Sequence, residues 1–239
     1  MSKDNLYKTE MSEVQPFEFN DDVVAVFPDM IRRSVPGYGS IVSGITSIGS
    51  VYLKDHTNCF DLGCSLGAVS IALSTHLRKN SCNIYAVDSS KPMLKKLEKT
   101  KSNLKLFIPI HSIFADINNI KLKNASLVIM NFTLQFIPLE ERLNILTKIH
   151  SGMNLGGALI ISEKVDLSDE EQHFAGIHEA FKSLNGYSKL EISQKRTALE
   201  NVLIPESAAH HRSRLEHIGF SSVTEWFRAF NFVSLLAIK

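Results

Sequence analysis

Residues 58–72, NCFDLGCSLGAVSIA, constrain the fold of this chain more than any other stretch. Cys59 and Phe60 are apolar and predict the end of a short buried strand, and a turn with glycines at Gly63 and Gly67 follows. Apolar residues at helical spacing come next. Glycine suits such a turn because it accepts positive φ and lets a ligand approach the backbone, and a helix N-terminus offers free N–H groups. Strand, turn and helix in this order indicate the first half of a nucleotide-binding βαβ unit.

The residue beside this turn, Asp61, narrows the choice of ligand. A glycine turn alone is a weak signal, because many strand-to-helix turns carry glycines for geometry only. A carboxylate next to the turn repels the pyrophosphate of a dinucleotide and suits a cationic ligand. The spacing D-x-G-x-x-x-G resembles the first motif of class I S-adenosylmethionine (SAM) methyltransferases, and SAM carries a sulfonium and an ammonium group but no phosphate. One departure is Ser65, which stands where the usual motif has its middle glycine.

Length and composition favour one α/β domain that binds a small molecule. The chain has 239 residues, enough for a sizeable core, and its 44% hydrophobic and 21% charged content is ordinary. A formal net charge of +1 gives no electrostatic footprint for nucleic acid, so we expect no direct nucleic-acid binding. No apolar run approaches the ~20 residues of a membrane span. Three cysteines without a C-x-x-C pair, and a polar start unlike a signal peptide, predict a cytoplasmic protein with reduced thiols.

The order of apolar patterns predicts an α/β, Rossmann-like class I methyltransferase fold: a mostly parallel seven-stranded sheet with an antiparallel closing strand and a helical lid insertion. After the glycine turn, strands are expected at 83–88, within 106–114, and at 126–131, 158–162, 222–230 and 232–238. We expect a polar N-terminal segment at 1–20, and then a single SAM-binding domain at 21–239. The insertion at about 165–219 emerges from the ligand-binding edge and is the natural substrate lid, although its helices could simply pack on the core.

Asp88 ends the second predicted strand, 21 residues beyond Gly67. An acidic residue at this place can hydrogen-bond both hydroxyls of a ribose. The alternative is that Asp88 caps the following helix. Ser90 and Pro92 already supply capping and first-turn residues for that helix, which favours the ribose.

Polar residues also follow the third and fourth predicted strands. Asp116 could accept a hydrogen bond from the adenine amine while Ile117 packs on the ring, or Asp116 could merely cap the next turn. Asn131 lies at the carboxyl edge of the sheet, where its amide could contact the amino-acid part of SAM. Tyr38, in a Pro-Gly turn, is either a surface tyrosine or a residue that closes over a ligand.

Residues for acid–base or metal chemistry are harder to find. The loop FTLQF at 132–136 contains no nucleophile or base, and the chain has neither a G-x-S-x-G elbow nor a P-loop. His173 and His178 lie off one helical face, and His210 and His211 are adjacent, so no metal site is predicted. The sequence therefore indicates a cofactor site more clearly than an acid–base pair.

A closer resemblance rests on the segments DLGCSLGA, NFTLQF, LNLGGALIISEK, NGYSKLEISQKR and ALENVL. Together they resemble the carboxy-S-adenosylmethionine (carboxy-SAM) synthase family over nearly the whole chain. This family has a methyltransferase fold but does not transfer methyl. The resemblance implies a homodimeric enzyme that converts SAM and prephenate to carboxy-SAM and phenylpyruvate. Carboxy-SAM then supplies a separate tRNA carboxymethyltransferase, which makes 5-oxyacetyl uridine at the wobble position.

The resemblance also implies which residues surround the ligand. It places around SAM the residues Tyr38, Gly63, Cys64, Ser65, Asp88, Ser89, Asp116, Ile117 and Asn131. It places Arg196, the residue expected to be catalytic, on the carboxylate added to the methyl carbon; taken alone, Arg196 could form a surface ion pair with Glu200 at i+4. The candidates for the carboxylates of prephenate are Arg32, Arg33, Arg212 and Arg214. An ordinary small-molecule methyltransferase and a non-catalytic SAM-binding module remain the alternatives.

Overall fold

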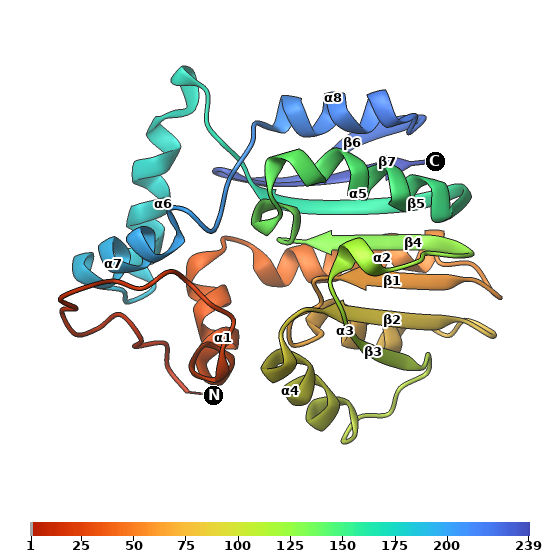
Figure 1. The fold of residues 1–239 in the computed structure, drawn as a ribbon, viewed down its shortest axis with the longest axis horizontal. Helices are drawn as coiled ribbons and strands as arrows, with labels where there is room; N and C mark the ends of the chain where they lie inside the picture. Colours follow the sequence, from red (N-terminus) through yellow and green to blue (C-terminus); the bar gives the residue numbers. More distant parts are fainter. Residues whose placement is uncertain (1) are drawn as a thin grey trace.

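One sheet of seven strands forms the centre of the computed structural model, which describes residues 2–239 (Figure 1). The strands are β1 Asn58–Leu62, β2 Asn83–Asp88, β3 Ile110–Phe114, β4 Ala125–Asn131, β5 Met153–Lys164, β6 Ser222–Ala229 and β7 Phe232–Ile238. Their order across the sheet is β3-β2-β1-β4-β5-β7-β6. Strands β1 to β5 pair in parallel, and β7 is antiparallel to both of its neighbours, β5 and β6. The predicted mostly parallel sheet with an antiparallel closing strand is confirmed.

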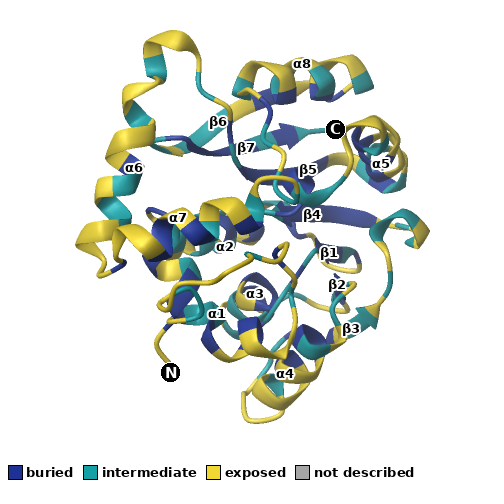
Figure 2. Ribbon diagram, turned by 60° about the vertical axis from the view of Figure 1, so that its left-hand side comes forward, coloured by how far each residue is buried: buried dark blue, intermediate teal, exposed yellow. Residues whose placement is uncertain are grey.

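Helices cover both faces of this sheet. They are α1 Asp21–Ser34, α2 Tyr38–Tyr52, α3 Ala68–His76, α4 Lys91–Lys101, α5 Leu139–Gly152, α6 His173–Leu184, α7 Lys189–Leu199 and α8 Ala208–Ile218, with short 3₁₀ turns η1 Ile117–Asn119, η2 Leu134–Phe136 and η3 Asp169–Glu171. Ile45 of α2 and Leu73 of α3 pack on one face, and Leu146 of α5 and Leu215 of α8 pack on the other. Because both faces are covered, β4 and β5 are buried along most of their length (Figure 2).

Side chains of the central strands alternate between these two cores. In β4, Leu127 and Ile129 join the α2–α3 core, whereas Val128 and Met130 join the α5–α8 core. This alternation follows from the two-residue period of a strand. It fixes the register, and it leaves the residues just beyond the strand ends free to face a ligand instead of a core.

The insertion after β5 divides into two parts with different roles. Helices α6 and α7 lie beyond the carboxyl ends of the parallel strands, next to α1 (Figure 1). Helix α8 instead packs against α5 and β6, and its Leu215 is completely buried. The expected lid range of 165–219 is therefore too long in this structure: the part over the strand ends stops before α8, because the apolar face of α8 completes the core.

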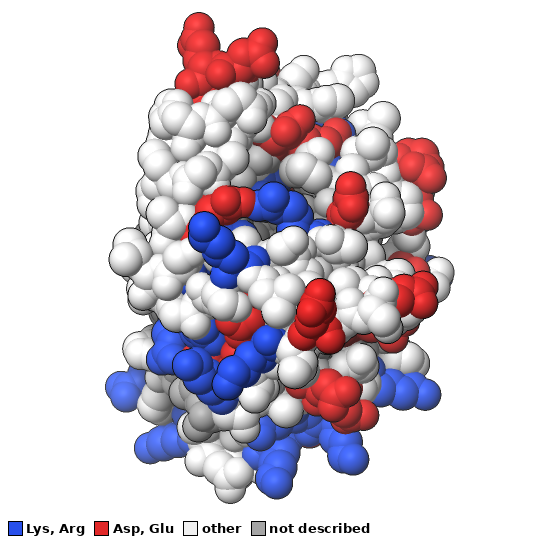
Figure 3. All heavy atoms as spheres, turned by 90° about the vertical axis from the view of Figure 1, so that its left-hand side faces the viewer, with Lys and Arg blue, Asp and Glu red and all other residues white. Residues whose placement is uncertain are grey.

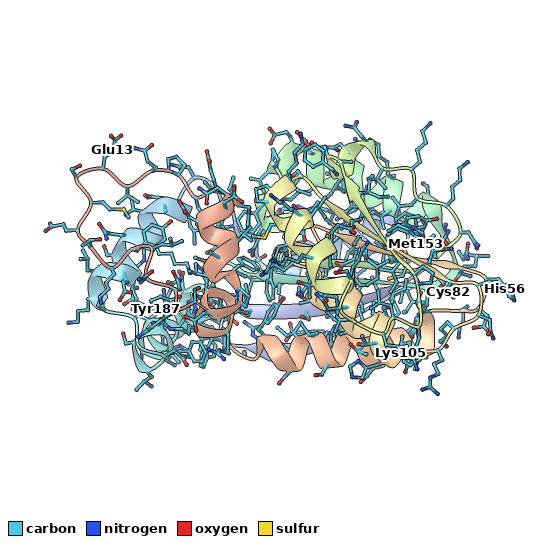
Figure 4. All side chains as sticks on the ribbon, turned by 90° about the horizontal axis from the view of Figure 1, so that it is seen from below. Glu13, His56, Cys82, Lys105, Met153 and Tyr187 are labelled. Carbon is cyan, nitrogen blue, oxygen red and sulfur yellow. The ribbon has the colours of Figure 1, made fainter. Side chains whose placement is uncertain are left out.

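The N-terminal segment, expected at residues 1–20, contacts the domain through a few specific residues. Asp4 is 1% exposed and accepts a hydrogen bond from the Tyr187 hydroxyl. Gln194 of α7 donates to the carbonyls of Tyr7 and Thr9 at 3.0 and 2.9 Å. Phe17 is buried against α1. Figure 4 shows this segment, which carries the labelled Glu13, at the same end of the molecule as Tyr187. A few buried groups thus join residues 2–20 to the domain, although the segment is mostly polar.

Candidate active site

A cavity of about 480 Å³ lies at the carboxyl ends of the parallel strands. Its walls come from the turn after β1, the ends of β2 and β4, the segment after β3, and the helices α1, α6 and α7. Here β1 pairs with β2 on one side and with β4 on the other, so the cavity occupies the switch point where ligands bind in such sheets. The lining includes every residue expected at SAM or at its added carboxylate: Tyr38, Gly63, Cys64, Ser65, Asp88, Ser89, Asp116, Ile117, Asn131 and Arg196.

The glycine turn owes its shape to left-handed backbone. Gly63 and Gly67 have φ of +76° and +74°, and a Cβ atom on Gly63 would lie 2.4 Å from the Thr133 side chain. Ser65 also has positive φ, 52°, where the usual motif has a glycine. Its N–H donates to Asp88 Oδ2 at 2.7 Å, which helps hold this less favourable conformation.

Asp88 therefore connects the turn to the tip of β2. Its other oxygen, Oδ1, accepts from the Ser90 N–H at 2.8 Å. The cap of α4 is Ser90, whose hydroxyl accepts from the Met93 N–H at 3.3 Å, so Asp88 is not the cap of this helix. Burial raises the pKa of Asp88. Each carboxylate oxygen can accept a further hydrogen bond, so binding of a ribose is compatible with these contacts and remains a prediction.

Two acceptors in the cavity lack a full set of partners. Asp61 is 2% exposed and accepts from the Ser70 N–H and hydroxyl through a single oxygen, Oδ2, at 3.2 and 2.6 Å. Burial, together with the nearby charge of Asp88 and against the hydrogen bonds from Ser70, raises the pKa of Asp61 to about 6. Among residues 2–239, nothing donates a hydrogen bond to the buried Oδ1 of Asn131. Buried acceptors without partners are costly, and a cationic ligand with N–H donors would satisfy them.

Asp116, Ile117 and Tyr38, which were also expected at SAM, line the cavity, but Asp116 has a structural contact as well. Asp116 Oδ1 accepts from the Asn118 N–H at 2.7 Å and so caps η1, which was the alternative considered for it. Its side chain and Ile117 nevertheless line the cavity. Tyr38 is half-buried, with its ring centroid 6.3 Å from that of Phe132, so it is not a surface tyrosine. Burial raises the pKa of its hydroxyl.

Comparison with known proteins assigns the family. A family model for a methyltransferase domain matches residues 60–157. Over 239 residues the chain is 47% identical to the carboxy-S-adenosyl-L-methionine synthase of Geobacter sp. (strain M21), covering 99% of this chain and 98% of that protein. The synthase of Vibrio cholerae is 44% identical, with 99% and 97% covered. The chain belongs to the carboxy-SAM synthase family.

Solved structures confirm the fold of this carboxy-SAM synthase family member. A putative SAM-dependent methyltransferase from Methanococcus maripaludis superposes with a TM-score of 0.61 at 21% identity, covering 96% of this chain and 97% of that one. Magnesium protoporphyrin IX methyltransferase from Synechocystis gives 0.60 at 16% identity, with 88% and 87% covered. At such identities the likeness concerns the class I methyltransferase fold alone.

Arg196 lines the cavity of this family member but lies at its edge. The side chain is 64% exposed, and its guanidinium pairs with Glu179 of α6. Arg196 therefore forms a surface ion pair with Glu179 of the neighbouring helix, and not the i+4 pair with Glu200 that was the alternative considered from the sequence. The contact of Arg196 with a ligand carboxylate remains a prediction, and it requires the guanidinium to exchange its partner.

None of the arginines proposed for prephenate lines the cavity. Arg33 is buried and donates to the Asp4 carbonyl and to Asp29, and Arg32 pairs with Asp29 at 2.9 Å. On α8, Arg212 donates to the Val223 carbonyl and Arg214 pairs with Glu206. Each of these guanidiniums is engaged within the protein and none lines the cavity, so the structure does not support the four candidates. Their positions in the chain carried no information about contacts such as the one between Arg33 and the Asp4 carbonyl.

Sequence reasoning missed a set of cations in the same cavity. Lys164 at the end of β5, Lys182 on α6 and Lys195 on α7 all line it. Burial, with a contribution from neighbouring cations, lowers the pKa of Lys182 and of Lys195 to about 8, and at Lys195 the nearby Asp4 opposes this decrease. No local signal could have identified them, because most lysines on predicted helices are solvated.

Replacing Asp61 with Asn should stabilise the ligand-free protein at pH 7 and weaken SAM binding. The pKa of Asp61 is raised from 3.8 to about 6, so the free energy of unfolding of the wild type falls as pH rises from about 4 to about 6. The corresponding cost of the buried charge is about 3 kcal/mol at most. Urea unfolding of both proteins between pH 4 and 8 measures the free energy of unfolding at each pH. If this free energy depends on pH equally in the variant and in the wild type, the raised pKa does not belong to Asp61.

Proposed function

We propose that this protein converts SAM and prephenate to carboxy-SAM and phenylpyruvate. The observation that supports this most is that the lining of one cavity includes both acceptors for a cationic ligand and cations for an anionic one. Asp61, Asp88 and Asn131 offer acceptors to a cationic ligand. Lys164 and Lys182, with Arg196 at the edge, offer positive charge to an anionic one. A methyltransferase with a neutral acceptor would have no use for the half-buried Lys164 and Lys182, because their partial desolvation is costly.

The reaction needs confinement more than a protein base. Prephenate loses its ring carboxylate as carbon dioxide and its ring hydroxyl as hydroxide, which leaves phenylpyruvate. The hydroxide takes a proton from the SAM methyl group and becomes water. The resulting carbanion, stabilised by the adjacent sulfonium, adds to carbon dioxide and forms the carboxymethyl group of carboxy-SAM. Both small species must be captured before they diffuse away, and an enclosed site that fixes the two substrates provides this.

Groups of this chain have corresponding tasks. The acceptors at the glycine turn orient SAM so that its methyl group points to the second substrate. Arg196 offers a planar fork that matches a new carboxylate in a bidentate manner. His178 is a weak base in this structure, because burial lowers its pKa to about 4, and its Nε2 donates its proton to the Ser34 carbonyl at 2.8 Å.

Incubation of the purified protein with SAM and prephenate tests the proposal. We expect phenylpyruvate and a product with the mass of SAM plus carbon dioxide in equal amounts. With ¹³C in the ring carboxylate of prephenate, the label should appear in the carboxymethyl group. Formation of S-adenosylhomocysteine with a methylated acceptor would instead identify an ordinary methyltransferase, and SAM binding without turnover would identify a binding module.

The biological setting belongs to the same proposal. Carboxy-SAM would supply a separate tRNA carboxymethyltransferase that acts on the wobble uridine, and this protein would work in the cytoplasm as a homodimer without binding tRNA itself. Its cysteines, Cys59, Cys64 and Cys82, are free and buried, which suits a reducing compartment. No helix within residues 2–239 has the length and apolar character needed to cross a bilayer. Light scattering of the purified protein, with and without tRNA, tests both the dimer and the absence of a tRNA complex.

A further inference from the structure

Two lysines in the cavity have no anionic partner. Within residues 2–239, the ammonium groups of Lys164 and Lys182 have no carboxylate within 4.0 Å and no hydrogen-bond acceptor. Lys195 differs, since it donates to the Ser34 hydroxyl at 3.0 Å and lies 3.7 Å from Asp4. Seen from the side that carries α6 and α7, some Lys and Arg side chains lie near the middle of the face with acidic groups beside them, and more of them lie in its lower half (Figure 3).

The positive charges at this end of the cavity repel one another. Burial is the largest cause of the lowered pKa of each lysine. Arg196 lowers the pKa of Lys164 further, with Asp166 opposing it, and Lys164 lowers that of Lys182. At Lys195 the nearby Asp4 raises the pKa and outweighs the effect of Lys182. Like charges that come together from β5, α6 and α7 are unfavourable in the free protein. An anion placed between Lys164 and Lys182 would relieve this repulsion.

We propose that Lys164 and Lys182 bind the carboxylate that the second substrate keeps throughout the reaction, which for prephenate is the carboxylate of the pyruvyl side chain. This inference rests on the proposed function. The choice between the two carboxylates follows from the chemistry. An ammonium group paired with the departing carboxylate would stabilise that anion relative to neutral carbon dioxide and would slow its loss. The retained carboxylate keeps its charge, so a cation can hold it without this penalty.

Replacement of Lys182 or Lys164 with Met should raise the KM for prephenate at least tenfold and change the Kd for SAM less than twofold. Lys189→Met provides a matched control, since Lys189 is an exposed lysine on α7 outside the cavity lining. An unchanged KM for prephenate in both variants would overturn the proposal. So would an equal loss of SAM affinity, which would assign the lysines to the carboxylate of SAM.

A binding measurement separates this inference from the proposed function. Calorimetric titration of phenylpyruvate into the complex with S-adenosylhomocysteine should show binding to the wild type and to Lys189→Met, and at least tenfold weaker binding to Lys182→Met. If the wild type makes no carboxy-SAM but this pattern holds, the proposed reaction fails and the anion site stands. If the wild type makes carboxy-SAM and the variants bind phenylpyruvate equally well, the anion site alone fails.

The stability of the ligand-free protein gives a readout that a purely structural lysine would not produce. Lys182 faces Lys164 from β5 and Lys195 from α7, with His178 on its own helix. Because its pKa falls from 10.5 to about 8, the unfolded chain binds more protons than the folded one between these values, and stability rises with pH there. Lys182→Met should melt at a higher temperature than the wild type at pH 7. Its stability should also rise less between pH 8 and 10.5 than that of the wild type. A lower melting temperature would contradict the proposal.

Discussion

Replacing Arg196 with Ala should remove the preference of this protein for carboxy-SAM over SAM. The two ligands differ by one carboxylate, and a hydrogen-bonded pair between a guanidinium and a carboxylate contributes about 1.5–3 kcal/mol. That corresponds to a loss of about 10- to 150-fold in affinity for carboxy-SAM, whereas SAM itself should bind almost as before. Calorimetric titration of both ligands into both proteins measures the ratio. If the ratio of the affinities for carboxy-SAM and SAM is unchanged in the variant, Arg196 does not bind the added carboxylate.

Replacing Glu179, the ion-pair partner of Arg196 in the free protein, gives a second test of this role. Its ion pair with Glu179 joins two side chains that are 64% and 47% exposed, and such pairs contribute no more than about 1 kcal/mol. A ligand carboxylate in a more enclosed position can therefore displace Glu179. Glu179→Gln should strengthen carboxy-SAM binding by a few-fold, because the guanidinium no longer has a competing anion. Arg196→Lys should recover only part of the preference, since an ammonium lacks the planar fork.

Replacing Asp88 with Ala should weaken SAM, S-adenosylhomocysteine and carboxy-SAM together. The variant loses the acceptor for the N–H groups of Ser65 and Ser90, and it loses the predicted bonds to the ribose. A lost charged hydrogen bond costs about 1–3 kcal/mol. Relaxation of the left-handed Ser65 would add to this, so we expect at least a tenfold loss of affinity for each ligand.

Titration of the three ligands tests this expectation, with Asp55→Ala as the control. Asp55 also accepts a backbone N–H, that of Asn80 at 3.0 Å, but it lies outside the cavity lining. Its replacement should leave all three dissociation constants unchanged. Equal binding of SAM by Asp88→Ala and the wild type would contradict the ribose assignment. A loss of affinity for carboxy-SAM alone would instead indicate an indirect effect on the binding of its added carboxylate near Arg196.

Much of the fold and half of the site follow from the sequence alone, because the signals are local. The apolar runs of β1 and β4 predict central strands, and the residues that follow such strands must meet at one edge of the sheet. Strand ends therefore bring Gly63, Asp88 and Asn131 together without any knowledge of side-chain contacts. The predicted glycine turn follows from the conformational freedom of Gly63 and Gly67, whereas the positive φ of Ser65, held by its bond to Asp88, was not predicted.

The other half of the site depends on contacts between residues far apart in the chain. Asp4 meets Tyr187 across 183 positions, and Arg33 reaches the Asn185 carbonyl across 152. These contacts engage Arg33 within the protein, whereas Lys164 and Lys182 are left without a partner facing the cavity. The composition of a helix shows which charges it carries. Whether a charge is buried, and what compensates it, is set by the neighbours that folding brings to it, so only the tertiary structure could reveal the cationic end of the cavity.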